Sequence, residues 1–123
     1  MDPEQVVREF NEALSAGDVE RMESLCTDAP EIVPLRAVLE GNRYEGPDAV
    51  RRFMADVDDV WSEVRVDIES FRIEGDTLIG RATWRGRGRE SGLEIEQHVG
   101  GRFRIERGRI ASFKAYVDPD EAG

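Results

Sequence analysis

The chain has 123 residues, of which 27 are acidic and 17 are lysine or arginine, so its formal net charge at pH 7 is −10. This acidity argues against nucleic acid as a partner, because a protein that binds phosphates presents an exposed basic surface. No run of about 18 apolar residues is present, which argues against a membrane partner. The first ten residues lack the basic start and apolar core of a signal peptide, so we expect a cytoplasmic protein. The length fits one domain spanning residues 1–123.

Cysteine and histidine are too scarce for several kinds of chemistry. Cys26 is the only cysteine, which excludes an internal disulfide. His98 is the only histidine and no acidic motif is clustered, so the ligand set for a metal is weak. We therefore expect neither a metal site nor another cofactor. Cys26 follows a predicted helix and is expected to be a small buried side chain.

Three helices are predicted in the first half of the chain. The first covers residues 3–15, with Asp2 as its N-cap and Gly17 at its end. Its apolar residues recur at helical spacing: Val6, Val7, Phe10, Ala13 and Leu14. A second, short helix is predicted over residues 19–25, and a third begins near residue 47 and runs to residue 61. These helices lack a partner helix of matching length, so we expect a sheet to cover their apolar faces.

Residues 27–46 give a weaker pattern, because prolines and glycines interrupt their short apolar pieces. We predict a short strand over residues 32–35 and a second arm over residues 38–44.

Four long strands are predicted in the second half, where apolar and polar residues alternate with period two. They cover residues 64–73, 77–86, 93–105 and 111–118. In the first of them the alternation slips by one residue between Ile68 and Phe71, which predicts a β-bulge. The arginine- and glycine-rich residues 85–89 are interpreted as a solvated hairpin connection.

The last two strands have one apolar face, which we expect to face the helices. That face consists of Leu93, Ile95, Gln97, Val99, Gly101, Phe103 and Ile105, followed by Ala111, Phe113, Ala115 and Val117. The other face carries His98, Arg102 and Lys114, and we expect His98 at the surface or in a dimer interface. Gln97 is the one polar side chain on the apolar face, so it needs a hydrogen-bond partner in the core or on a ligand.

The sequence allows the Arg81 side chain to lie on either face of its strand. Leu78, Gly80, Ala82 and Trp84 form the apolar set of the strand, which places Arg81 in solvent. The reverse parity would bury Arg81, and a buried arginine needs a carboxylate or a ligand.

The order of the elements predicts an α+β fold with three N-terminal helices packed on a strongly curved, mostly antiparallel sheet. With that order, the chain resembles the nuclear transport factor 2 like superfamily, in particular its SnoaL-like branch. The likeness is carried by residues 13–18 (ALSAGD), 44–50 (YEGPDAV), 75–84 and 103–118. The resemblance implies a cone-shaped fold, a ligand pocket between sheet and helices, and a homodimer formed through the other face of the sheet. It does not imply one activity, because a fold hosts many functions.

Two chemistries of related proteins do not match this sequence. For ketosteroid isomerases, the position of the aspartate base falls on or beside Val33 and that of an oxyanion acid near Gly101. For limonene epoxide hydrolases, the arginine matches Arg81, but the two acids fall on Thr83 and Ala115. Both mechanisms are therefore disfavoured. The acid/base residue of SnoaL-like cyclases has its nearest counterpart in Asp118.

Two hypotheses follow, and whether the protein is an enzyme is left open. In the first, an apolar pocket holds a small apolar organic ligand, and any chemistry is a proton transfer with Arg81 and Asp118 as weak catalytic candidates. The expected ligand-binding residues are Leu14, Trp61, Arg81, Gln97, Val99, Phe113, Ala115 and Val117. In the second, the protein is a non-catalytic homodimeric binding or interaction module, with its interior filled by its own side chains. A continuous interior volume of a few hundred cubic ångströms would support the first hypothesis, whereas a filled core would remove it.

Overall fold

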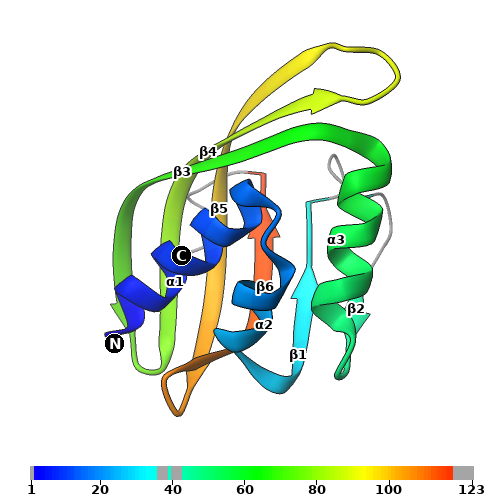
Figure 1. Ribbon diagram of the computed structural model, residues 1–123. Helices are drawn as coiled ribbons and strands as arrows, with labels where there is room; N and C mark the ends of the chain where they lie inside the picture. Colours follow the sequence, from blue (N-terminus) through cyan, green and yellow to red (C-terminus); the bar gives the residue numbers. More distant parts are fainter. Residues whose placement is uncertain (1, 36–38, 40–42, 118–123) are drawn as a thin grey trace.

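The computed structural model describes residues 2–35, 39 and 43–117 (Figure 1). Its elements are α1 (Pro3–Ala16), α2 (Val19–Ser24), β1 (Cys26–Val33), β2 (Tyr44–Glu45), α3 (Ala49–Val60), β3 (Trp61–Glu74), β4 (Thr77–Gly88), β5 (Glu94–Glu106) and β6 (Arg109–Tyr116). The strands form one sheet in the order β2-β1-β6-β5-β4-β3. Only the β1–β6 pair is parallel among the pairs of this sheet. The three helices lie on one side of the bent sheet, so the predicted α+β cone is confirmed.

The first helix starts and ends where its sequence signals predict. The Asp2 side chain accepts a hydrogen bond from the backbone N–H of Gln5 at 2.9 Å, as an N-cap does. Gly17 has a φ of 71°, the left-handed conformation that glycine adopts easily after a helix. Within the described ranges, none of the helices has the length and apolar character needed to span a bilayer.

The core is centred on Phe10, whose side chain is fully buried. Its ring meets those of Phe103 and Phe113 edge-on, with centroid distances of 6.3 and 6.2 Å. These contacts show that Phe103 and Phe113 of the predicted apolar face meet α1, while Lys114 on the opposite face is exposed. The prediction was wrong for the start of that face, because Leu93 and Ile95 are 68% and 46% exposed. Val117 was assigned to the same apolar face, but it follows the last residue of β6 and is 53% exposed.

The first strand differs from its prediction. It begins at Cys26 instead of residue 32, although Pro30 lies within it. The register of β1 against β6 shifts between Cys26 and Glu31, and this irregularity accommodates a residue that has no N–H to donate. Of the predicted second arm over 38–44, only its last residue lies in β2, and residues 38 and 40–42 lie outside the described residues.

The long strands show two features of their own. The register of β3 against β4 shifts between Ile68 and Ser70, which confirms the predicted bulge. Strand β4 runs to Gly88, so the prediction of a hairpin connection over residues 85–89 was wrong for most of that segment. Its arginines are strand residues because they pair across the sheet: Arg85 contacts Glu96 at 2.8 Å.

Two tryptophans leave no room for a side chain at Gly86. The rings of Trp61 and Trp84 meet edge-on at a centroid distance of 4.9 Å. A Cβ atom on Gly86 would lie 2.8 Å from Cζ2 of Trp84 and 2.9 Å from Cε3 of Trp61, closer than real Cβ atoms approach. The absence of a side chain at this position therefore allows the ring pair to form.

We predict that Gly86→Ala lowers the free energy of unfolding by about 1–3 kcal/mol, because the new methyl group forces the rings apart. Gly80→Ala is the matched control on the same strand, since its Cβ would meet the Phe71 ring at an ordinary 3.4 Å. The control is expected to change stability by less than about 1 kcal/mol. Urea unfolding followed by circular dichroism measures both, and equal stability of the two variants would contradict the prediction.

Candidate functional site

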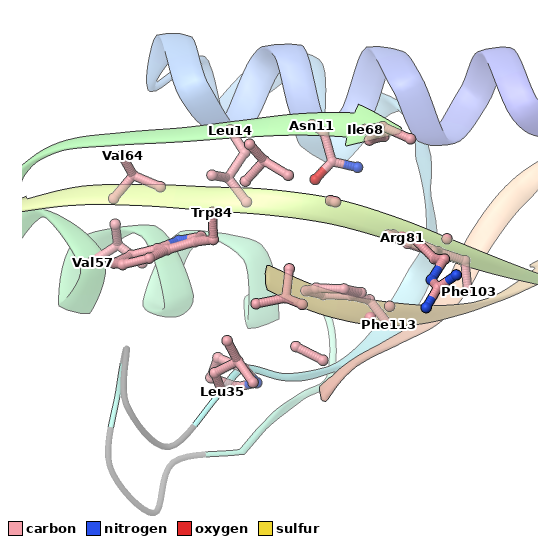
Figure 2. A pocket seen from close by; sticks show the side chains of 18 of the residues that line it. Asn11, Leu14, Leu35, Val57, Val64, Ile68, Arg81, Trp84, Phe103 and Phe113 are labelled. Carbon is pink, nitrogen blue, oxygen red and sulfur yellow. The ribbon is translucent and has the colours of Figure 1, made fainter. Parts of the chain in front are cut away.

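A cavity lies between the concave face of the sheet and the helices α1 and α3 (Figure 2). Its volume, measured as the space open to the centre of a water molecule, is about 70 Å³. The wall is predominantly apolar, and its aromatic side chains are Phe53, Phe71, Trp84, Phe103 and Phe113. Among the described residues that line the cavity, Asn11 and Arg81 are the only polar ones.

The hollow exists because the strands carry small residues where they face it. Gly80 and Ala82 on β4, and Gly101 and Ala115 on β5 and β6, all line the cavity. Gly101 is required for the shape of one wall, since a Cβ there would lie 3.0 Å from the Phe103 ring. Small side chains ringed by large ones thus leave an unfilled space in a core that is otherwise closely packed.

Asn11 is the polar group of this site that the sequence analysis missed. It is only 5% exposed, and its Nδ2 atom donates a hydrogen bond to the carbonyl oxygen of Val7 at 2.9 Å. Figure 2 shows its amide pointing from α1 toward the interior of the cavity. Asn11 follows Val7 by four residues and precedes Leu14 by three, so it belongs to the apolar stripe of the helix. A polar residue in that stripe was the signal that could have identified it.

Four of the predicted ligand-binding residues lie together at the cavity: Leu14, Val99, Phe113 and Ala115. They come from α1, β5 and β6, so the period-two pattern of the strands and the helical stripe converge on one space. Whether they bind a ligand stays a prediction.

Arg81 borders the cavity, but its side chain is exposed. Its neighbours in β4, Gly80 and Ala82, face inward, so alternation along the strand places the Arg81 side chain on the outer face. This is the direction that the apolar alternation favours. The guanidinium group is therefore not part of the apolar interior.

Three predicted residues lie outside the cavity. Trp61 lines a neighbouring groove, and Val117 is 53% exposed beyond the end of β6. Gln97 is the cross-strand partner of Trp84, so both lie on the face of the sheet that meets the helices. Gln97 is half-buried, but on β5 the cavity ends at Val99. The sequence pattern gives the face of a residue but not its position along the strand relative to the large Trp84 ring. The catalytic candidate Asp118 lies outside the described residues.

The only histidine lies on the outer face of the sheet. His98 pairs with Thr83 in the strand register, and its Nδ1 atom is 3.8 Å from Oε1 of Glu69. The Thr83 hydroxyl donates to the same Glu69 oxygen at 3.0 Å. The His98 side chain is 75% exposed, as expected for a surface histidine, so it does not reach the cavity.

Cys26 is buried, and its thiol is protonated at neutral pH. Burial raises the pKa of its thiol to about 12, and the negative charge of Glu23 adds to this effect. Cys26 does not line the cavity. No group of three or more His, Cys, Asp or Glu side chains suited to a metal ion occurs among the described residues.

An open groove adjoins the cavity between the end of α1 and α3, over the first half of β3. The groove and the cavity share Leu14, Val57, Val64 and Val66. The rest of the groove includes charged side chains such as Glu12, so water solvates it, in contrast to the apolar cavity. The shared apolar residues form the boundary between the two spaces.

The sequence matches the family model described as SnoaL-like domain over residues 7–113. The chain belongs to the SnoaL-like domain family. The match includes all of the described residues that line the cavity, from Asn11 to Phe113, except Ala115. No curated protein matches the chain.

Solved structures share the fold at low sequence identity. A protein from Catenulispora acidiphila DSM 44928 with a ketosteroid isomerase-like fold, in complex with trimethylamine, is 18% identical with a TM-score of 0.81, over 94% of this chain and 86% of that one. A nuclear transport factor 2 like protein of unknown function from Burkholderia pseudomallei K96243 is 23% identical with a TM-score of 0.81, over 96% and 92%. A putative polyketide cyclase from Sinorhizobium meliloti is 21% identical with a TM-score of 0.71, over 90% and 93%. At these identities the likeness shows the fold alone.

We predict that Cys26 does not react with a thiol reagent in the folded SnoaL-like protein. A pKa of about 12 lowers the thiolate fraction at pH 8 on the order of 10³-fold relative to a free cysteine. Labelling with dithionitrobenzoate should therefore be complete only after unfolding in urea. Rapid labelling of the folded protein would show that the Cys26 thiol is accessible and ionised.

Proposed function

We propose that this SnoaL-like protein binds a small, largely apolar organic molecule in its cavity and does not transform it. The observation that carries the proposal is the cavity itself, an apolar space of about 70 Å³ whose wall is built from aromatic and aliphatic side chains. Ligand sites are typically concave, mostly apolar and equipped with few polar groups. This volume is smaller than the few hundred cubic ångströms expected for the first hypothesis, but the interior is not completely filled by side chains as the alternative requires. The cavity therefore supports a ligand of small size.

The size of the cavity limits the ligand. A water molecule needs roughly 10–15 Å³ on this measure, so about five waters fit in the space. A ligand of about seven non-hydrogen atoms, such as a single aromatic ring with one substituent, is at the upper end of what enters without movement of the walls. Drug-sized ligands use pockets of roughly 300–1,000 Å³. A steroid or a polycyclic polyketide is therefore not proposed.

Binding is proposed in place of catalysis because of the chemistry of the lining. Proton transfer needs a side chain that takes up or gives a proton within hydrogen-bond reach of the substrate. Among the described residues of the lining, none is a carboxylate, a histidine, a cysteine or a tyrosine. The crystal structure of the Catenulispora protein in complex with trimethylamine supports a small ligand, since that molecule is smaller than one aromatic ring.

The groove supplies a route for the ligand. It opens to solvent beside the cavity and shares Leu14 and Val57 with it. A ligand that moves from the groove past these two side chains loses its water and enters an apolar interior.

The expected affinity is modest. At roughly −0.7 kcal/mol per non-hydrogen atom, within the range of small ligands, about seven atoms give about −5 kcal/mol. This corresponds to a Kd of roughly 0.2 mM. At ten times that concentration, the ligand should stabilise the folded state by about 1.4 kcal/mol.

We predict that about 2 mM toluene raises the melting temperature by about 5 °C in a thermal-shift measurement, because it binds the folded state alone. Ala115→Ile places three more carbon atoms in the cavity and should reduce this shift below about 1 °C. Ala29→Ile is the matched control, since Ala29 is exposed on β1 and does not line the cavity. An unchanged shift in Ala115→Ile would contradict binding in the cavity.

The homodimer that the family resemblance implies stays a prediction. Static light scattering tests it, because a monomer has a mass of 13.9 kDa and a dimer has twice that mass. We expect the dimer mass at micromolar concentration, and a monomer mass over the same range would contradict it.

A further inference from the structure

We propose that Asn11 selects the ligand, so that the cavity prefers a neutral molecule with one hydrogen-bond donor on an apolar body, such as a phenol or a small alcohol. This inference rests on the proposed function, because it assigns the chemistry of the ligand to the same cavity. Asn11 is a positioning and specificity-determining residue in this account.

The amide of Asn11 has one hydrogen bond and one unused acceptor. Its Nδ2 atom donates to the Val7 carbonyl oxygen at 2.9 Å. Among the described residues no donor other than a ligand or water is available to its Oδ1 atom, and this oxygen is open to the cavity, because no fully buried side-chain oxygen of these residues lacks a partner. A ligand N–H or O–H that takes the place of water on this oxygen inside the apolar cavity gains from the contact.

The orientation of the amide follows from its partner. The Val7 carbonyl oxygen can only accept a hydrogen bond, so the NH₂ group of Asn11 must face it. The Oδ1 atom of the amide is then left for the cavity. Phe103 and Phe113 line the same cavity as this side chain. A donor on a ring or a short chain therefore reaches Oδ1 while its apolar body packs on these rings.

The ligand should be neutral. An ion that enters the cavity loses its hydration shell and needs an opposite charge in return. The described lining contains no carboxylate to pair with a cation. For an anion, the single cationic residue at the border is Arg81, whose side chain lies on the outer face of β4. A neutral donor avoids both penalties and satisfies Asn11.

Three ligands of similar size separate the hydrogen bond from the apolar contact. Phenol offers a donor, anisole replaces that hydrogen by a methyl group, and toluene has no polar atom. Their dissociation constants are measured by isothermal titration calorimetry for the wild-type protein and for Asn11→Leu, which keeps the size of the side chain. Gln5→Leu is the matched control, since it makes the same exchange at an exposed position of the same helix.

The expected result is a selective loss. In Asn11→Leu the Kd for phenol should rise at least about tenfold relative to the Kd for toluene, while anisole should follow toluene. Gln5→Leu should leave all three dissociation constants unchanged. Asn11→Ala serves as a second variant if Asn11→Leu does not fold, with the same change expected in the ratio of phenol to toluene.

The outcomes distinguish this inference from the proposed function. If toluene binds and the phenol-to-toluene ratio is the same in wild type and variants, the assignment of Asn11 is overturned and the binding function stands. If anisole depends on Asn11 as strongly as phenol does, Asn11 acts as a donor, and the preference for a ligand donor is wrong. If none of the three binds the wild-type protein, the proposed function itself fails.

Discussion

The packing of Phe10 against the stacked rings of Phe103 and Phe113 determines where α1 lies on the sheet, and the rest of the interior depends on that placement. Phe10 is fully buried, and each of its two edge-on contacts joins the helix to a different strand. Once Phe10 is fixed, the helical repeat carries Asn11 and Leu14 to the wall of the cavity. The Ser15 hydroxyl accepts a hydrogen bond from the Val66 N–H at 3.2 Å and ties the end of the same helix to β3. The helix thus forms one side of the cavity as a rigid unit.

The cavity is a result of side-chain size on a curved sheet. Large rings at Trp84, Phe103 and Phe113 support the helices, while glycine and alanine between them leave the sheet surface uncovered. The bulge in β3 lets Ile68 and Phe71 both face inward, which adds curvature at that side. The family match shows the SnoaL-like domain. One fold can host many chemistries, so the function depends on this space and on the buried amide of Asn11.

Much of this architecture could be predicted from the sequence, because alternation along a strand records which face is covered. That pattern placed Val99, Phe113 and Ala115 on the inner face, and all three line the cavity. The pattern does not record depth, so Gln97 was expected in a site that ends two residues further along β5, at Val99, although its cross-strand partner Trp84 lines the cavity. Asn11 was missed because a polar residue in a helical stripe resembles the edge of that stripe. The start of β1 was missed because its irregular parallel pairing with β6 accommodates Pro30, and a local pattern contains no trace of that distant partner.

Xenon binding reveals whether the interior contains an accessible apolar space, because xenon enters such cavities and needs no hydrogen bond. Crystals of the protein pressurised with xenon should show one strong density peak among Trp84, Phe113 and Asn11. Xenon density confined to surface sites, with none between the helices and the sheet, would contradict this expectation.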